Sequence, residues 1–466
     1  MGVVQDYLYP KLPISIQNLS ISIFGLFWYK RRFGGVYKKE LIGFKGRENF
    51  SYKQWEIYQN DELRKILLNA YVNVSFFKQN FIKAGIQLDD LKIFELSDLQ
   101  KLPILEKEDL RMFGNNTLLS KALDKNGEFY SSSGSTGTPT QIYFSKKMHQ
   151  KWSACFEARI RNWAGLNIKT PRGMVGGRRV VKEGNAKGPF YRYNFVEKQT
   201  YFSAYHINAK NVDDYIQGIR KHKVEYMTGY AMSNYFLAKF IEESEIKAPK
   251  LKAVITSSEK LTDEMRDTFR RVYGCNTFDS YSGVEACGLI SECEHGKLHM
   301  SPDAGILEVI KPDGKYALPG ETGELICTGL LNFDQPLIRY RIGDVVTLAK
   351  VQTCKCGRNM PIVQEIIGRL EDTVVGLDGR LMVRFHGIFV GLPGIVEGQI
   401  IQEELNYFII NVVLTSDLTE ELISIIQKRM WSQLGEVHVK VSAVDSIPRN
   451  QNGKFKAVIS KVNVDK

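Results

Sequence analysis

The feature that most constrains the fold is an alternation of short β-branched runs with helical stretches in the middle of the chain. "YFSAYHI", "VEYMTGY" and "LKAVITSS" are followed in turn by "NVDDYIQGIRKH", "AMSNYFLAKFIEE" and "KLTDEMRDTFRRVYG". A βαβα succession of this kind is typical of helices layered on a sheet. From Gly127 onward we therefore expect an α/β layered domain.

Other patterns flank this region. From about Asp61 to Leu119 the apolar residues have helical spacing, with a break at Pro103. From Gly305 to Lys350 the text is strand and turn, and Asp313-Gly314 predicts a hairpin. A small β-rich part is therefore expected after the α/β core.

The last hundred residues predict a smaller α+β unit. "QIIQEELNYFIINVVLTS" has the pattern of paired strands, and "EVHVKVSAVDSIP" that of another strand. Between them, an amphipathic helix presents an apolar stripe of Leu422, Ile426, Met430 and Leu434. We expect three parts: a helical region 1–124 within a large domain, an α/β core with a β-rich subdomain 125–370, and a C-terminal α+β domain 371–466.

Composition limits the class of protein. The 466 residues are 43% hydrophobic and 25% charged, which is an ordinary globular composition. The net charge of +11 indicates an anionic partner such as a nucleotide, a coenzyme phosphate or an anionic membrane. No helix-turn-helix, finger or RNA-reading signature is present, so no nucleic-acid partner is expected. Seven cysteines, an odd number, and the lack of a secretory signal predict a reducing, cytoplasmic location.

Residues 12–35 are apolar and aromatic, then sharply basic. The apolar part is shorter than the ~20 residues that a spanning helix needs. One interpretation is a buried helix packed on the core. The other is peripheral contact with the inner face of the cell membrane, with Phe27, Trp28 and Tyr29 at headgroup level and Lys30, Arg31 and Arg32 toward anionic lipid.

A run of small hydroxyl residues and glycines, "YSSSGSTGTPT", predicts a loop that wraps phosphates. Backbone N–H groups of a glycine-relaxed loop can converge on an anion, and hydroxyls add donors. The P-loop pattern is absent, so a phosphate-binding loop here belongs to another nucleotide-binding class, and a solvated linker is the alternative. The candidate residues are Ser132, Ser133, Gly134, Ser135, Thr136, Gly137 and Thr138.

Four further motifs follow this loop in a fixed order: "YSGVEACG", "RYRIGD", "IGRLED" and "IPRNQNGKFKAVIS". Each is weak alone, but their order is specific. The sequence resembles the adenylate-forming acyl-CoA synthetase superfamily, and within it the phenylacetate–CoA ligases, especially the branch encoded with capsule and surface-polysaccharide genes. "SSGSTGTPT" and "CKCGRNMP" bear the closer resemblance. The fold it implies is a large adenylate-forming domain with a small mobile C-terminal domain.

The resemblance implies ATP-dependent activation of a small carboxylic acid to an acyl-adenylate, followed by transfer to coenzyme A or to a sugar amine or hydroxyl. Catalytic roles are expected for Lys454, Glu285 and Arg369, with Glu285 holding Mg²⁺ against the phosphates. The nucleotide site would include the loop above together with Ser258, Glu259, Tyr281, Ser282, Gly283, Glu285, Asp344 and Arg369.

The sequence departs from the family pattern at three positions, and the departure at the hinge is mild. Glu371 stands at the hinge position of the C-terminal domain, where Asp is more usual. Val284 replaces a Ser or Thr just before the acid, and Ser282 replaces a common glycine. The alternative function is therefore a nucleotide-binding, catalytically weakened component of a membrane-associated polysaccharide assembly.

A separate group of residues has the composition of a structural zinc site. Three thiols and one imidazole form a closed tetrahedron around Zn²⁺. The expected ligands are Cys293, His299, Cys354 and Cys356, with His299 preferred over His295, and related proteins have such a site. Unligated thiols in a loop are the alternative.

The acyl pocket is the least defined part of the expected site. By family position, His206 and Tyr230 are the substrate candidates, although a lone histidine on a strand is more often simply packed. Related enzymes are often homodimers, which makes a homodimer an expectation from the resemblance alone.

Overall fold

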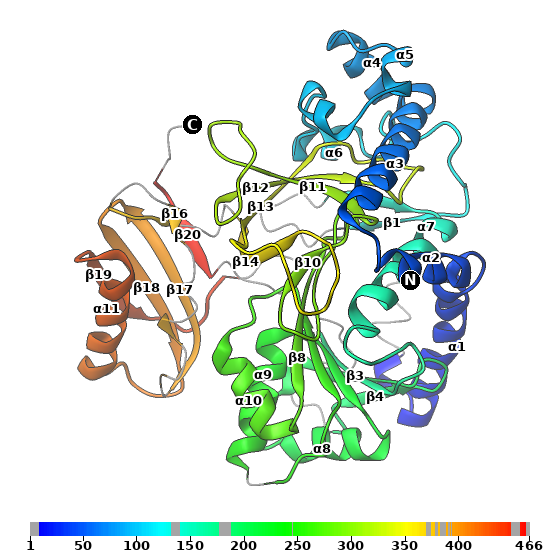
Figure 1. Ribbon diagram of the computed structural model, residues 1–466. Helices are drawn as coiled ribbons and strands as arrows, with labels where there is room; N and C mark the ends of the chain where they lie inside the picture. The colour runs from blue at the N-terminus through cyan, green and yellow to red at the C-terminus, as the bar shows by residue number, and fades with distance from the viewer. Residues whose placement is uncertain are drawn as a thin grey trace.

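The computed structural model describes residues 9–131, 140–176, 188–244, 246–369, 374–377, 381–382, 388–389, 392, 394–448 and 457–462. Within these residues a large mixed α/β part is accompanied by a small C-terminal part with its own sheet (Figure 1). The expected fold class is confirmed. Among the described helices, none has the length and apolar character needed to cross a membrane.

The centre of the large part is a twelve-stranded sheet in the described chain, with the order β11-β12-β13-β14-β10-β9-β8-β7-β6-β3-β5-β4. β5, β3, β6, β7 and β8 run parallel, and the strands on either side are antiparallel. The strands are β3 (Arg172–Gly176), β4 (Tyr191–Asn194), β5 (Gln199–Ser203), β6 (Tyr226–Tyr230), β7 (Ala253–Ser257), β8 (Asn276–Tyr281), β9 (Ile290–Glu292), β10 (Leu298–Met300), β11 (Gly305–Ile310), β12 (Thr322–Gly329), β13 (Tyr340–Leu348) and β14 (Ile362–Arg369).

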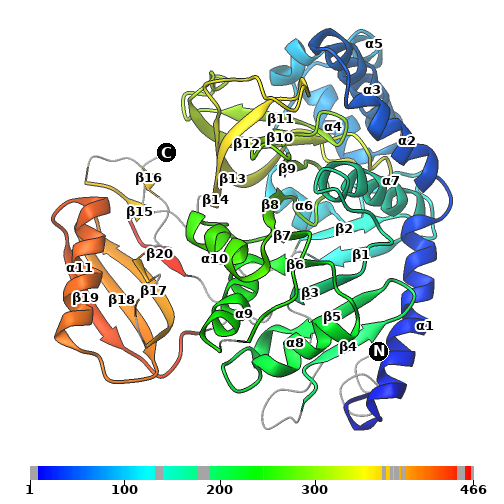
Figure 2. The same ribbon diagram turned by 60° about the horizontal axis from the view of Figure 1, so that its bottom comes forward.

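The predicted alternation is present as β5–α8, β6–α9 and β7–α10. The helices are α8 (Val212–Lys221), α9 (Ala231–Glu243) and α10 (Asp263–Tyr273), and their apolar faces pack together with the parallel strands in one core cluster (Figure 2). α10 begins at a Thr262 side chain that accepts from the Met265 amide and ends at Gly274 with φ +65°. These are the usual start and stop chemistries of a helix.

The N-terminal helices form a second core cluster with the antiparallel strands. The predicted helical pattern is present and the break at Pro103 falls between two helices. These helices are α2 (Tyr37–Arg47), α3 (Tyr52–Asn73), α4 (Ser75–Lys83), α5 (Leu88–Lys92), α6 (Lys107–Phe113) and α7 (Lys146–Phe156), and β1 (Glu128–Ser131) pairs with β2 (Gln141–Phe144) before α7.

The predicted hairpin turn at Asp313-Gly314 connects β11 to β12. Gly314 has φ +78°, a conformation that favours glycine, and the Lys311 amide donates to the Lys315 carbonyl at 2.8 Å. The predicted hairpin is therefore confirmed as an ordinary connection between two paired strands.

The small C-terminal part has a four-stranded sheet with the order β19-β18-β17-β20. α11 (Glu420–Leu434) packs on it, and the four residues of the predicted stripe are buried in a third core cluster. The strands of the four-stranded sheet are β17 (Ile395–Glu404), β18 (Tyr407–Leu414), β19 (His438–Ala443) and β20 (Val458–Ser460). The small part also contains the pair β15 (Val374–Val375) and β16 (Leu381–Met382).

Residues 12–35 contain helix α1 (Ile14–Phe33), and the interpretation of a buried helix packed on the core is right for one face of the helix and wrong for the other. One face of α1 packs on β4 and α7, and the opposite face is exposed. The expectation that Arg31 and Arg32 point outward is also wrong, because both guanidinium groups bond to other parts of the protein.

Candidate active site

Several predicted site residues meet at one edge of the sheet. Strands β5, β6, β7 and β8 run in the same direction in the sheet, so their carboxyl ends lie at the same edge. In open α/β sheets this edge is where ligands bind. His206 follows β5, Tyr230 ends β6, Ser258 and Glu259 follow β7, and Tyr281 ends β8.

The backbone at this edge has conformations that L-residues rarely adopt. Gly229, just before Tyr230, has φ +126°, and a Cβ there would lie 1.8 Å from the Val175 carbonyl oxygen. Ser258 has φ +67°, in the left-handed region. Strained backbone of this type clusters at binding and catalytic sites, because the surrounding structure must hold it.

Tyr281 connects the parallel strands to the β-rich part. Its phenol donates a hydrogen bond to Oδ2 of Asp344 on β13 at 2.5 Å. Burial, and then the adjacent Asp344 carboxylate, raise the pKa of Tyr281 well above its usual value, so the phenol keeps its proton. Asp344 is in turn the β-ladder partner of Arg369 on β14, and the motifs "YSGVEACG", "RYRIGD" and "IGRLED" thus meet in space.

Glu285 lies in a tight turn after β8. The Ala286 amide donates to the Gly283 carbonyl at 3.2 Å, and a Cβ on Gly283 would meet Glu285 Oε2 at 2.3 Å. A side chain at position 283 would therefore displace the carboxylate, which folds back over the turn. Glu285 is buried, and the exposed side chain beside it is Val284.

Thr140 is a site residue that the motif reasoning missed. It is fully buried, and its hydroxyl, just before β2, donates to Glu285 Oε1 at 3.4 Å. The signal was available, because Thr140 ends the same Ser/Thr/Gly run that predicted the loop.

Two further predicted residues, Glu259 and His206, also have protein partners in the structure. Glu259 Oε2 accepts a hydrogen bond from the Met232 amide at 2.8 Å, at the start of α9. His206 is buried, its Nδ1 lies 2.8 Å from Ser203 Oγ, and its ring stacks on Phe190. A substrate role for His206 stays a prediction.

Other predicted residues fall outside the described part of the chain. They are the phosphate-loop residues Ser132, Ser133, Gly134, Ser135, Thr136, Gly137 and Thr138, the hinge residue Glu371 and the catalytic candidate Lys454. For Arg369 the structure describes the strand position, and Ser282 lies in the described loop after β8.

The predicted metal ligands come together from three segments. Ligand atoms of Cys293, His299, Cys354 and Cys356 all lie within 4.8 Å of one another. The two sulfur atoms of Cys293 and Cys354 are 3.7 Å apart, and Cys356 Sγ is 3.4 Å from His299 Nε2. Bond lengths around Zn²⁺ require separations of about 3.5–3.8 Å in a tetrahedron. These two separations lie close to that range, and three thiols with one imidazole have the chemistry of a structural zinc site.

The imidazole of this group has the expected second partner. Its Nδ1 lies 3.4 Å from the Met360 carbonyl oxygen, an arrangement that orients Nε2 toward the thiols. His295, the other histidine of "ECEHGKLHM", is exposed and outside the group.

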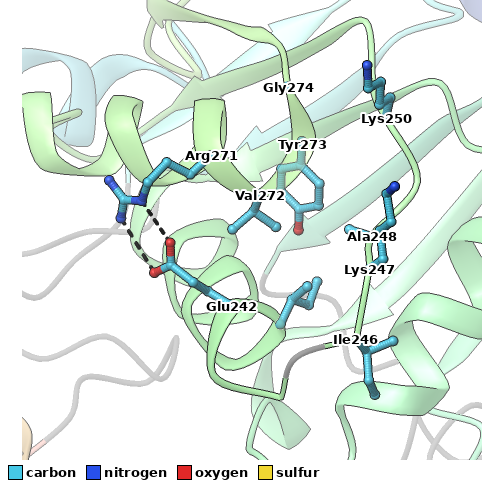
Figure 3. Close-up of a pocket in the computed structure, with 10 residues that line it drawn as sticks. Glu242, Ile246, Lys247, Ala248, Lys250, Arg271, Val272, Tyr273 and Gly274 are labelled. Carbon is cyan, nitrogen blue, oxygen red and sulfur yellow. Dashed lines mark hydrogen bonds and ion pairs between the residues drawn. The ribbon is translucent and has the colours of Figure 1, made fainter.

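A surface pocket of about 300 Å³ lies away from this edge, between α9 and α10 (Figure 3). Glu242 and Arg271 pair across it with a 2.8 Å contact. Its lining includes none of the predicted site residues that the structure describes, so it does not contribute to the candidate site.

Comparison with known proteins agrees with this geometry. Residues 378–461 match the family model described as the CapK C-terminal domain. Protein CapK of Staphylococcus aureus is 23% identical over 463 residues, which cover 98% of this chain and 99% of that protein. Phenylacetate-coenzyme A ligase of Pseudomonas putida is 27% identical over 327 residues, 68% of this chain and 71% of that enzyme.

A solved structure shares the fold. It is the structure of 2-hydroxyisobutyryl-CoA ligase in the postadenylation state with R3-HIB-AMP. The match covers 89% of this chain and 91% of that chain, with 19% sequence identity and a TM-score of 0.68. The resemblance to the adenylate-forming superfamily, to phenylacetate–CoA ligases and to the capsule branch is thus confirmed.

Proposed function

We propose that this chain, similar to phenylacetate–CoA ligases and to protein CapK, is an adenylate-forming ligase that activates a small carboxylic acid with ATP. The observation that supports it most is the Tyr281–Asp344 hydrogen bond at the carboxyl edge of the parallel strands, beside the ladder position of Arg369. It joins three motifs that are far apart in the sequence into one site.

The proposed first step is an attack by a carboxylate oxygen of the acid on the α-phosphorus of ATP. The bond from that phosphorus to the bridging oxygen of the β-phosphate breaks, and pyrophosphate leaves with the electron pair. Glu285 would hold Mg²⁺, Asp344 would accept hydrogen bonds from the ribose hydroxyls, and Lys454 would supply a cation to the reacting oxygens.

In the proposed second step a nucleophile attacks the acyl carbon and AMP departs. We propose coenzyme A as the acceptor, or the amine or hydroxyl of a sugar in capsule or surface-polysaccharide synthesis. The support for coenzyme A is the similarity to phenylacetate-coenzyme A ligases, and the support for a capsule role is the similarity to CapK. A cytoplasmic site of action is supported by the absence of disulfides among the described cysteines.

The decisive experiment is ATP–pyrophosphate exchange, screened over carboxylic acids. Exchange that depends on one acid and falls at least a hundredfold in Lys454→Ala supports the proposal. Lys461→Ala is the matched control, because Lys461 is in the same C-terminal unit and forms an exposed ion pair with Glu403. Acid-independent ATP turnover, or equal loss in both variants, would contradict it.

A second candidate function rests on Val284. It is an exposed apolar side chain beside the acid of the nucleotide motif, where a hydroxyl would contact phosphate. A chain weakened in adenylation would bind ATP, as calorimetry can measure, and would release no AMP with any acid.

We also propose that Cys293, His299, Cys354 and Cys356 hold a structural Zn²⁺. Four protein ligands leave no open position for chemistry, so its contribution would be stability. The group packs with Trp55, and Trp163 lies edge-on to His299, which would tie the N-terminal helices to the β13–β14 connection.

A further inference from the structure

Helix α1 has polar or small residues at each of its fully buried positions. The face against β4 contains the buried residues Gln17, Ser22 and Gly25. Most amphipathic surface helices pack an apolar stripe on the core and expose polar residues. In α1 the fully buried positions are not apolar, and although Ile21 and Phe33 also pack on the core, most of the large apolar side chains are exposed.

Specific hydrogen bonds fix this orientation. Asn18 Oδ1 accepts from the Tyr193 amide at 2.9 Å, and Ser22 Oγ accepts from the Phe195 amide at 3.0 Å. A Cβ on Gly25 would lie 2.3 Å from the Asn194 side chain, so the helix backbone approaches β4 closely. A rotation that buried the apolar stripe would break these contacts and leave buried polar groups unpaired.

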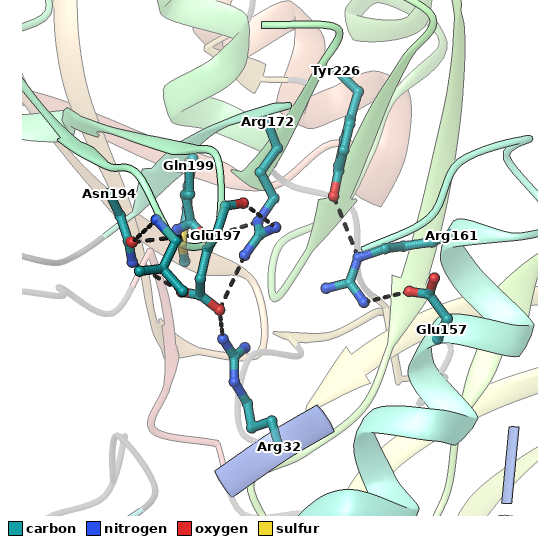
Figure 4. Close-up of polar contacts among 10 residues, drawn as sticks. Arg32, Glu157, Arg161, Arg172, Asn194, Glu197, Gln199 and Tyr226 are labelled. Atoms are coloured by element: carbon teal, nitrogen blue, oxygen red, sulfur yellow. Dashed lines mark hydrogen bonds and ion pairs between the residues drawn. The ribbon is translucent and has the colours of Figure 1, made fainter. Parts of the chain in front are cut away.

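A buried ion pair fixes the end of the helix. The Arg32 guanidinium bonds to the Glu197 carboxylate, which is also 3.5 Å from Arg172 (Figure 4). Arg31 donates to the Phe144 carbonyl at 2.8 Å. Breaking a buried pair of this type costs several kcal/mol, so the orientation of α1 is strongly determined by the protein.

The outward face is mostly apolar, and Ser20 is an exposed polar residue within it. Phe27 is 68% exposed and Ile23 53% exposed, and both lie on the helix side opposite to Gly25. The turn after β4, which contacts α1, adds exposed Phe195 and Val196. We call this the α1 face, and it consists of Ile16, Leu19, Ile23, Phe24, Leu26, Phe27, Phe195 and Val196.

We propose that the α1 face docks on an anionic lipid surface. Contiguous exposed apolar surface indicates an interaction site. From Leu12 to Lys39 the sequence has no acidic residue, and the exposed cations Lys11 and Lys30 flank the apolar stripe, with Lys38 and Lys39 following in α2. Apolar residues bordered by lysines match the boundary between acyl chains and anionic headgroups.

The charge distribution also favours lipid over a second copy of this chain. Two α1 faces in contact would bring equal sets of lysines together without a compensating acid on the helix. In both views α1 lies at the outer edge of the large part, on the side away from the C-terminal part (Figures 1 and 2). Docking there would leave the carboxyl edge of the sheet and the C-terminal part clear of the membrane.

The test is flotation of the purified full-length protein with phosphatidylcholine vesicles, with and without phosphatidylglycerol. We expect binding that requires phosphatidylglycerol and weakens at high salt. The double variant Ile23→Glu, Phe27→Glu should reduce binding roughly tenfold or more, because it places two acids on the face. The matched control is Ile93→Glu, Met112→Glu, which makes the same charge change at two exposed apolar residues elsewhere.

Sedimentation of the same proteins separates the alternatives. Unchanged vesicle binding in the α1-face variant, or equal loss in the control, would overturn the proposal. A wild-type dimer that binds no vesicles and dissociates in the α1-face variant would assign the face to a second copy. Thermal melts should show that both variants are folded. A wild-type monomer that binds no vesicles would also overturn the proposal that the α1 face docks on lipid.

Discussion

The phenol of Tyr281 at the end of β8 donates a hydrogen bond to the Asp344 carboxylate on β13, and this contact connects the parallel and antiparallel halves of the large sheet. It also fixes the carboxylate that would meet the ribose. Tyr281→Phe removes the donor while keeping the ring. We expect the KM for ATP in pyrophosphate exchange to rise about tenfold, since hydrogen bonds to charged groups contribute ~1.5–3 kcal/mol.

The control for this change is Tyr316→Phe. Tyr316 donates to the Glu308 carboxylate at 3.0 Å, a similar pair in the β-rich part away from the strand edge. Its removal should leave the KM for ATP unchanged. Equal effects of the two variants would mean that Tyr281 acts through general stability.

Val284→Thr should increase the rate of adenylation. The side chain is exposed beside Glu285, so a hydroxyl can be added there without disturbing the core. An extra donor to phosphate predicts a several-fold gain in exchange rate. Val351→Thr, at another exposed valine, is the control. A loss of rate would indicate that the valine is adapted to this chain's own substrate.

Metal removal should destabilise the large part. His299→Ala and Cys356→Ser should abolish bound zinc, measured by elemental analysis, and lower the melting temperature, because structural zinc binding contributes directly to folding. His295→Ala should retain zinc and the wild-type melting temperature, since His295 is exposed outside the group. Wild-type protein that contains no zinc after expression with added metal would contradict the site.

Asp279 predicts a pH dependence of stability. Burial, and then the Glu292 carboxylate, raise the pKa of Asp279 from 3.8 to about 7. The folded protein therefore binds this proton more tightly than the unfolded chain does. The stability that the protonated group contributes is complete below about pH 4 and is lost as the pH rises through about 7.

Asp279→Asn should remove this loss. As the pH rises from about 5 to about 8, the free energy of unfolding should decrease less in the variant than in the wild type. The difference between the two decreases should be on the order of 1 kcal/mol or more. Exposed Asp267 supplies the control, Asp267→Asn. Denaturant melts across this pH range test it, and parallel stability curves for Asp279→Asn and wild type would show that the carboxyl stays ionised in the fold.

Local patterns were sufficient for most elements of the fold. The stripe from Leu422 to Leu434 is buried because its period matches a helix, and Asp313-Gly314 turns because glycine tolerates positive φ there. The same reasoning left two interpretations open at α1. Its apolar residues were compatible with burial or with an exposed interface, and the hydrogen bonds that orient it join Asn18 to β4 and Ser22 to the turn after β4, 175 and 173 residues away in the sequence.

The sequence by itself determined the alternation of strands and helices, the order of the motifs and the identities of four thiol and imidazole candidates for a metal site, because periodicity and side-chain chemistry are local. The tertiary structure decided which of these residues meet. Tyr281 reaches Asp344, and His299 rather than His295 joins the cysteines, because sheet order brings distant strands together. It also decided which face of α1 is exposed, because buried polar partners on β4 outweigh the hydrophobic pattern of the helix alone.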